Sequence, residues 1–205
     1  MSAPRIFCIG RNYAAHVREL GHAEDGECVV FMKPATSLVA ADAPLALPRK
    51  RGAVHFEAEM TVRIGTAGRD IDEASAHRHI DAVGLGIDLT LRDLQTTLRE
   101  RGAPWEACKA FDGSAPLGPW QPRPDGDLQA LRFSCSVNGE LRQEGDTGHM
   151  LFPVARILRI LSETWTLLPG DIIYTGTPAG VGPLVAGDVI TLQGDGLGRA
   201  EWHCV

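Results

Sequence analysis

Alternation of apolar and polar residues is the main pattern along this chain, and it predicts more strands than helices. The segment 55–65, "HFEAEMTVRIG", is rich in alternating and β-branched positions and ends at a glycine, which is typical of a strand. The segment 29–40 predicts a strand that ends at Pro34 before a turn, and "AVGLGIDLT" at 82–90 predicts a further strand. Within 131–145, an Asn–Gly pair separates two alternating runs, which is the strongest short signal for a β-hairpin.

Three other segments show helical features. Residues 72–79 follow acidic residues that can cap a helix, and residues 91–102 place leucines at positions 91, 94 and 98 before an Arg–Gly stop. A third helix is expected over 152–163, where it begins beside a proline. Because strands and helices do not alternate regularly, we predict an α+β fold with mostly antiparallel or mixed sheets.

The length and composition of the chain fit one globular domain. With 205 residues, of which 44% are apolar, the chain can bury a substantial core without disulfides or structural metals. We expect a single domain over 1–205, with an N-terminal segment at 1–45 and the main body at 46–205.

Charge and cysteine content argue against several classes of function. The net charge is −6 and "PRKRG" at 48–52 is the only basic cluster, so nucleic acid is not an expected partner. No apolar stretch is long enough to span a bilayer, and the N-terminus lacks the order of a signal peptide, so we expect a cytoplasmic protein without a membrane partner. The five cysteines form no CxxC pair, which argues against disulfides and zinc. Only Cys108, beside Lys109, is near candidate chemistry.

Two acids lie on one face of the strand expected at 55–65. Because side chains alternate along a strand, Glu57 and Glu59 point to the same face as His55. The opposite face is apolar and carries Phe56, Ala58 and Met60. If the acidic face meets water, such a pair is ordinary surface charge.

A third acid changes this interpretation. Asp88 ends the apolar run "AVGLGI", where an unpaired carboxylate would be costly. Three oxygen donors on strands, with no cysteines or histidine pair at zinc spacing, suit a hard divalent cation such as Mg²⁺, which also removes the repulsion between the acids. Spacing leaves one alternative open, because arginines can also neutralise buried acids. Glu57, Glu59 and Asp88 are therefore candidate metal ligands or ion-pair partners.

The helix expected after Asp88 carries two further candidates. Arg92 and Gln95 are three residues apart, so both can face the cation from one side. Arg92 can bind a substrate carboxylate through two hydrogen bonds, and Gln95 can add another. The alternative for Arg92 is an ion pair with a structural acid such as Asp93 or Glu57.

His16 and Glu19 form a second candidate pair in "IGRNYAAHVRELG". They are three residues apart and touch on one helical turn. A carboxylate behind an imidazole fixes its tautomer and raises its basicity, as a general base for water requires. The simpler alternative is a pair of surface residues on a helix.

Lysine is rare in this chain, which has three lysines and seventeen arginines. A compact ammonium can approach an oxyanion or donate a proton. Lys109, in "CKAFDG", is the stronger candidate, because the signal at Lys33 is weak and Lys50 lies in the basic cluster.

The Gly/Thr turn at 174–182 can offer N–H groups and the Thr177 hydroxyl to a carboxylate, or serve only as a tight turn.

Eight segments together resemble the fumarylacetoacetate hydrolase family, in its short single-domain branch of acylpyruvate hydrolases and oxaloacetate-acting relatives. Each segment is weak alone, but all eight occur in order over nearly the whole chain. The segments are "GRNYAAHVRE", "FMKPATS", "HFEAEMTVRIG", "GIDLTLRDLQ", "KAFDGSAPLGP", "VNGELRQ", "LLPGDIIYTGTPAGVG" and "AGDVITLQGDGLG".

The resemblance implies a fold and a set of residue roles. The fold is a three-layer β/β/α arrangement of mixed sheets, usually in a homodimer, and the cofactor is Mg²⁺, with Mn²⁺ as the other candidate. In similar proteins the His–Glu segment is a lid that orders when ligand binds, and "GHAEDGE" at 21–27 is polar enough to be mobile. The matched residues are Glu57, Glu59 and Asp88 as metal ligands, His16 and Glu19 as the water-activating pair, Lys109 at the substrate oxyanion, and Arg92, Gln95 and Thr177 as substrate-binding residues.

The activity implied by the resemblance is Mg²⁺-dependent hydrolysis of the C–C bond of a 2,4-dioxo acid, an acylpyruvate such as fumarylpyruvate from aromatic catabolism. His16 would deprotonate water, and the pyruvate enolate that leaves would be stabilised by the cation and Lys109. Two alternatives use the same enolate: an oxaloacetate decarboxylase or tautomerase, and a 2-hydroxyhepta-2,4-diene-1,7-dioate isomerase or decarboxylase. A non-catalytic binding protein for small dicarboxylates is a further alternative, against which the complete set of candidate catalytic residues argues.

Overall fold

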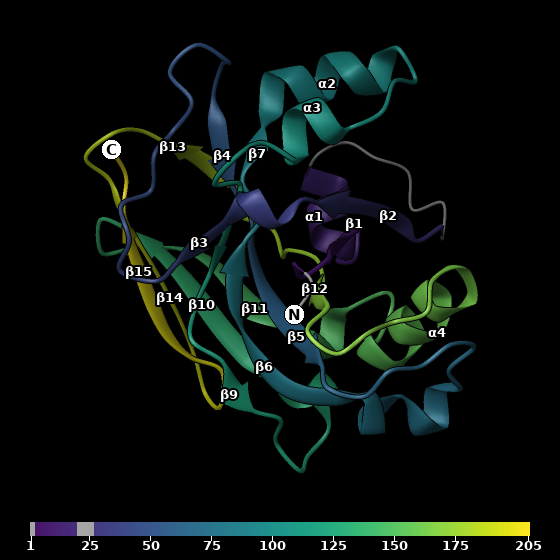
Figure 1. Cartoon of the computed structure of the whole chain (residues 1–205). Coiled ribbons are helices and arrows are strands. Elements are labelled where there is room, and N and C mark those ends of the chain that lie inside the picture. Colours follow the sequence, from purple (N-terminus) through teal and green to yellow (C-terminus); the bar gives the residue numbers. More distant parts are fainter. Residues whose placement is uncertain (1–2, 20–26) are drawn as a thin grey trace.

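Three β-sheets dominate the computed structural model, which describes residues 3–19 and 27–205 (Figure 1). The segment expected to be mobile at 21–27 lies outside the described residues except for its last position. The largest sheet has the order β2-β1-β12-β5-β6-β8-β3, with β9 paired to β6. Its strands are β1 (Ile6–Gly10), β2 (Val29–Lys33), β3 (Leu38–Ala40), β5 (Ala58–Ile64), β6 (Ile80–Ile87), β8 (Ala115–Leu117), β9 (Gln121–Pro122) and β12 (Ile172–Tyr174).

Two smaller sheets complete the β structure. The four-stranded sheet has the order β11-β10-β14-β15, and the three-stranded sheet has the order β13-β4-β7. In the largest sheet β1 pairs with β12 and β3 pairs with β8 in parallel, whereas β5 and β6 are antiparallel. The mixed α+β fold expected from the sequence is therefore confirmed. The remaining strands are β4 (Val54–Phe56), β7 (Thr90–Leu91), β10 (Arg132–Val137), β11 (Glu140–Asp146), β13 (Gly182–Leu184), β14 (Val189–Gly194) and β15 (Gly198–His203).

Helices are short. The α-helices are α1 (Ala14–Glu19), α2 (Arg92–Glu100), α3 (Glu106–Lys109) and α4 (Val154–Thr164), and the 3₁₀ helices are η1 (Ala35–Ser37), η2 (Glu73–His79), η3 (Leu128–Ala130) and η4 (Thr147–His149). Among the described residues, none of these helices is long and apolar enough to cross a membrane.

Most of the elements expected from the sequence are present. α2 and α4 confirm two of the three expected helices, and β10 and β11 form the hairpin, with Asn138 and Gly139 both at positive φ in its turn. The segment 72–79 is a 3₁₀ helix instead of an α-helix. Its first turn is tight, because the Ser75 N–H donates to the Asp72 carbonyl three residues back, and β6 begins directly after its last residue.

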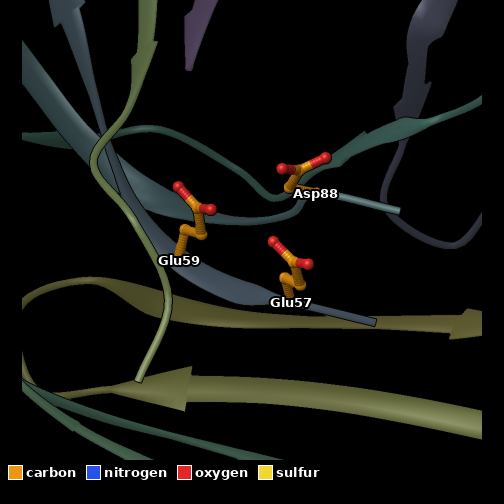
Figure 2. A group of neighbouring side chains, drawn as sticks. All are labelled: Glu57, Glu59 and Asp88. Atoms are coloured by element: carbon orange, nitrogen blue, oxygen red, sulfur yellow. The ribbon is translucent and has the colours of Figure 1, made fainter. Parts of the chain in front are cut away.

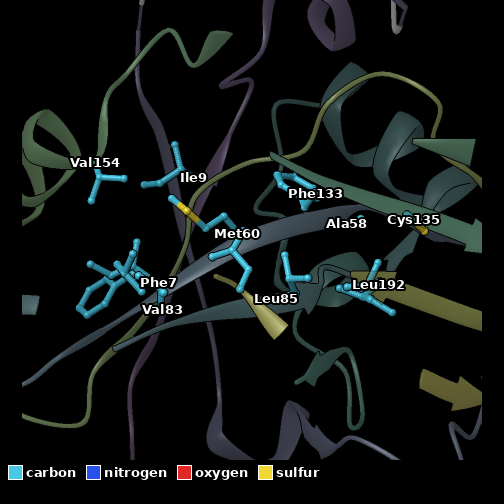
Figure 3. Close-up of a cluster of buried hydrophobic side chains, with 14 of the residues drawn as sticks. Phe7, Ile9, Ala58, Met60, Val83, Leu85, Phe133, Cys135, Val154 and Leu192 are labelled. Atoms are coloured by element: carbon cyan, nitrogen blue, oxygen red, sulfur yellow. The ribbon is translucent and has the colours of Figure 1, made fainter. Parts of the chain in front are cut away.

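The main hydrophobic core includes residues of the large sheet, the four-stranded sheet and α4 (Figure 3). Met60 of β5 and Leu85 of β6 belong to the same buried cluster as Phe133 of β10 and Leu192 of β14. This packing covers one face of β5 and β6.

The strand expected over 55–65 is interrupted at Glu57. The chain leaves the three-stranded sheet after β4 and enters the large sheet at β5, which is a change that simple alternation does not reveal. The expected assignment of faces is nevertheless confirmed. Phe56, Ala58 and Met60 are fully buried in the main core.

We predict that Leu158→Ala lowers the free energy of unfolding by about 2–5 kcal/mol, because it removes a fully buried side chain from α4. Leu141→Ala is the matched control: Leu141 on β11 is 58% exposed, so the change should stay within about 0.5 kcal/mol. Denaturant unfolding measures both. Equal losses in the two variants would contradict the assignment of α4 to the core.

Candidate metal centre

Three carboxylates converge on the face of the large sheet opposite the main core. Glu57 precedes β5, Glu59 lies on β5 and Asp88 follows β6, and Figure 2 shows their side chains directed toward one another. The candidate ligand oxygens all lie within 4.8 Å of one another. Exposed fractions of 5%, 1% and 1% exclude ordinary surface charge. The three acids that the sequence predicts as candidate ligands therefore form one buried cluster, called the acidic group below.

Lys109 neutralises two of the three acids. Its Nζ donates to Glu57 Oε2 at 2.9 Å and Asp88 Oδ2 at 2.6 Å, and also to Thr90 Oγ1 at 2.6 Å. Burial lowers the pKa of Lys109, but the carboxylates of Asp88 and Glu57 outweigh burial and raise the pKa above its usual value. Lys109 is therefore an ammonium at neutral pH.

Lys33 lies at the same site, although its signal in the sequence is weak. Its Nζ lies 2.8 Å from Asp88 Oδ1 and donates to the backbone carbonyls of Leu89, Lys109 and Ser114. The residue is 2% exposed. Two of the three lysines of the chain are thus buried at the acidic group. The scarcity of lysine is the sequence signal that finds both.

Arg92 pairs with one of the acids, which is an alternative that the sequence left open. Its guanidinium donates to Glu57 Oε1 and to Gln95 Oε1. Burial raises the pKa of Glu57, but Lys109 and Arg92 outweigh burial and hold the pKa well below its usual value. Arg92 and Gln95 therefore lie at the acidic group, as their spacing on α2 suggests.

Glu59 has the least compensation of the three acids. Burial raises the pKa of Glu59 well above its usual value, and the neighbouring carboxylates of Asp88 and Glu57 raise it further. The Gly176 N–H donates to Glu59 Oε2 at 2.6 Å and acts in the opposite direction. A cation among the three acids would remove the repulsion that Glu59 experiences.

His16 and Glu19 form the pair expected from their spacing. His16 Nδ1 lies 3.1 Å from Glu19 Oε2, and the Gly180 N–H donates to Glu19 Oε1 at 2.9 Å. His16 is 5% exposed, so it is not a surface residue, and it lies close enough to Glu57 that a positive charge on its ring would lower the pKa of that carboxyl. α1 therefore places this pair beside the acidic group.

Thr177 is held by two hydrogen bonds. Its hydroxyl donates to the Ala58 carbonyl at 2.8 Å and accepts from Gln143 Nε2 at 2.8 Å. Contact between Thr177 and a substrate stays a prediction. Gln143 has no individual signal in the sequence, where it is one residue of the hairpin.

Cys108 takes no evident part in the site. Burial raises the pKa of its thiol to about 11, and Sγ donates to the Trp105 carbonyl at 3.0 Å. The residue is therefore a buried thiol rather than a reactive thiolate.

The donor set fits a hard divalent cation. All three side chains offer carboxylate oxygens, which Mg²⁺ and Mn²⁺ prefer to the sulfur and nitrogen donors of zinc sites. Asp88 Oδ1 receives no aligned hydrogen bond although Lys33 Nζ is close, so this buried oxygen keeps coordinating capacity. Glu57, Glu59 and Asp88 are the residues that would hold the ion.

Nearly the whole chain matches one protein family. Residues 5–205 match the family model described as Fumarylacetoacetate (FAA) hydrolase C-terminal. The chain belongs to the fumarylacetoacetate hydrolase family. This confirms the resemblance noted in the sequence.

Relatives within the family carry different activities in their names. The chain is 43% identical to oxaloacetate tautomerase YcgM of Escherichia coli strain K12, over 94% of this chain and 89% of the relative. It is 40% identical to mitochondrial oxaloacetate tautomerase FAHD1 of Mus musculus, over 94% of this chain and 87% of that relative. The structure of fumarylpyruvate hydrolase from Pseudomonas aeruginosa in complex with Mn²⁺ and pyruvate is 41% identical, with a TM-score of 0.94 over 99% of this chain and 90% of that one. The chain is thus a family enzyme with an acidic site suited to a divalent metal, and the reaction class differs among its relatives.

We predict that Asp88→Asn weakens Mn²⁺ binding by more than about 100-fold, because it removes a ligand oxygen and leaves two buried lysines without their shared partner. Isothermal titration calorimetry measures the affinity. Asp81→Asn is the control, since Asp81 forms a half-exposed pair with Arg63. Normal Mn²⁺ affinity in Asp88→Asn would remove the ligand assignment.

We predict that the metal-free Glu59→Gln variant is more stable than the parent protein, and increasingly so as pH rises from mildly acidic to mildly alkaline. Folding raises the pKa of Glu59, so the folded parent protein loses stability as pH rises above the usual carboxyl pKa. Glutamine has no proton to lose. Thermal unfolding in a chelator across this pH range measures the difference, and a difference that shrinks with pH would contradict the raised pKa.

Proposed function

We propose that this chain is a Mg²⁺- or Mn²⁺-dependent enzyme that interconverts the enol and keto forms of oxaloacetate. The observation that carries the proposal is the convergence of three buried acids, Lys109 and the His16–Glu19 pair at one site. The names of the two curated relatives support oxaloacetate as the substrate. This is one of the alternatives left open by the sequence, and it has more support than acylpyruvate hydrolysis.

The charge of the site suits a substrate with two carboxylates. Three acids and three cations surround the same space, so their charges balance when all six are ionised; they are Glu57, Glu59, Asp88, Lys33, Lys109 and Arg92. A bound divalent cation leaves an excess of two positive charges. Oxaloacetate carries two negative charges at neutral pH and restores the balance, because a charge buried without a partner is costly.

The surrounding residues have separable roles in this reaction. When bound, the divalent cation supplies a Lewis acid for negative charge on the oxygens of a 2-oxo acid. Lys109 provides a fixed ammonium for the same charge, and Arg92 can bind a carboxylate in a bidentate manner. In the neutral tautomer whose Nδ1–H donates a hydrogen bond to the Glu19 carboxylate, Nε2 keeps a lone pair and can exchange a proton with carbon C3 of the substrate.

Hydrolysis of an acylpyruvate is the second candidate. It is favoured by the likeness to the fumarylpyruvate hydrolase of Pseudomonas aeruginosa and by the His16–Glu19 pair, which could activate water instead of substrate. Fumarylpyruvate also has two carboxylates, so charge does not separate the two candidates.

A substrate panel tests the proposal. We expect kcat/KM with Mg²⁺ to be higher for ketonisation of enol-oxaloacetate than for fumarylpyruvate, acetylpyruvate or 2-oxo-heptenedioates. The loss of ultraviolet absorbance of each enol follows the reactions, and a chelator-treated sample is the control. A clear preference for fumarylpyruvate would replace tautomerisation with hydrolysis.

We predict that His16→Ala slows tautomerisation and any hydrolysis by about 10²- to 10⁴-fold, because both need a proton transferred at a defined atom. Decarboxylation of oxaloacetate should fall less, since it needs only stabilisation of negative charge. Lys109→Met should impair all three reactions. If decarboxylation fell as far as hydrolysis in His16→Ala, His16 would not be confined to proton transfer.

A further inference from the structure

Gln143 lies at the junction of three parts of the site. It is 1% exposed on β11, and all three of its hydrogen bonds go to segments of the metal centre. Its Oε1 accepts from the Ala58 N–H at 2.9 Å, and its Nε2 donates at 2.8 Å to both Thr177 Oγ1 and the Pro178 carbonyl.

Ala58 is the residue between the two glutamates of the metal centre, and it lacks a strand partner on one side. β12 pairs with β5 only from Thr61 to Arg63, and the chain after Tyr174 then leaves the sheet as a turn. At Ala58 the missing strand is replaced by side chains. The Ala58 N–H donates to Gln143, and the Ala58 carbonyl accepts from Thr177.

These contacts form a closed ring that the amide side chain of Gln143 completes. The Thr177 hydroxyl has one proton, which it donates to Ala58, so it must accept its second hydrogen bond from Gln143. Gln143 must therefore accept at one end and donate at the other. A carboxylate at this position would lack the donor, and an apolar side chain would lack both groups.

The same glutamine holds the turn against which the His16–Glu19 pair docks. Gly180, at φ 99°, donates its N–H to Glu19, and a Cβ atom at this glycine would lie 2.0 Å from the Arg142 carbonyl. The turn is therefore packed directly on the backbone next to Gln143. The Nε2 atom of Gln143 holds the beginning of this turn by donating to the Pro178 carbonyl.

We infer that Gln143 is a positioning residue of the metal centre, which sets the spacing of the Glu57 and Glu59 carboxylates through Ala58. It also aligns the turn at 176–180 with the rest of the site. The inference rests on the proposed function for the presence of a divalent ion, and it is independent of which substrate the enzyme uses.

The test is Mn²⁺ binding to the whole protein, measured by isothermal titration calorimetry alongside thermal unfolding. Gln143→Leu keeps the size of the side chain and removes the polar groups, and we expect its Mn²⁺ affinity to fall about 10- to 100-fold. Thr177→Val opens the ring from the other side and should produce a loss of the same order. Both variants break the same ring. The Mn²⁺ affinity of the double variant should therefore be little lower than that of the single variant that binds Mn²⁺ less tightly.

Gln129→Leu is the matched control. Gln129 also accepts from a backbone N–H, that of Val154 at 2.9 Å, and donates to the Thr147 carbonyl, but it lies away from the acidic group. This variant should lower the melting temperature and leave Mn²⁺ affinity unchanged. It therefore separates a general loss of stability from a loss of ligand positioning.

The outcomes distinguish this inference from the proposed function. If the parent protein binds Mn²⁺ and Gln143→Leu binds it equally well, Gln143 is only a structural residue and the inference is overturned. If Gln143→Leu fails to fold, normal Mn²⁺ affinity in Thr177→Val overturns it in the same way. A parent protein that binds Mn²⁺ but leaves oxaloacetate unchanged overturns the function alone, and one that binds no Mn²⁺ overturns both.

Discussion

The balance of buried charge at the acidic group is the constraint on which the rest of the structure depends. Three carboxylates are withdrawn from water on the face of β5 and β6, and their desolvation would be prohibitive without nearby cations. Lys109 and Lys33 supply this compensation from α3 and from the end of β2. These two elements thus bring the compensating charges to the large sheet.

Compensation by lysines and an arginine has a chemical advantage over burial among apolar groups. The acids are already gathered, so a divalent ion finds its ligands in place rather than ordering them on arrival. Burial and the neighbouring carboxylates raise the pKa of Glu59, so an ion that replaced its proton would relieve the cost of its burial. The cations that hold Glu57 and Asp88 would then lie beside the bound ion.

The sequence predicts the acidic group well, because its members follow the simplest geometric rule. Alternation along 55–65 puts Glu57 and Glu59 on one face, and the end of an apolar run identifies Asp88. The interruption at Glu57 is not predictable in this way, since the change of sheet depends on pairing with β13, which is far away in sequence.

Residues that act through long-range contacts are the part that sequence reasoning misses. Gln143 is separated from Ala58 by 85 positions, and nothing in its local hairpin distinguishes it from a solvent-facing residue. Lys33 is an intermediate case. The sequence shows that lysine is rare in this chain, but it does not show that Lys33 pairs with Asp88. Pair interactions of this kind become evident only when the topology brings the segments together.

The interior position of β1 has a consequence for how the protein is made. β1 (Ile6–Gly10) is synthesised well before its parallel neighbour β12 (Ile172–Tyr174). One edge of an apolar strand therefore stays without its native partner until β12 is made, which is a hazard for aggregation. β12 leads directly into the turn that contacts Glu59, so closure of the sheet and completion of the acidic group wait for the same segment. Nascent chains that stop before this point would have no assembled metal centre.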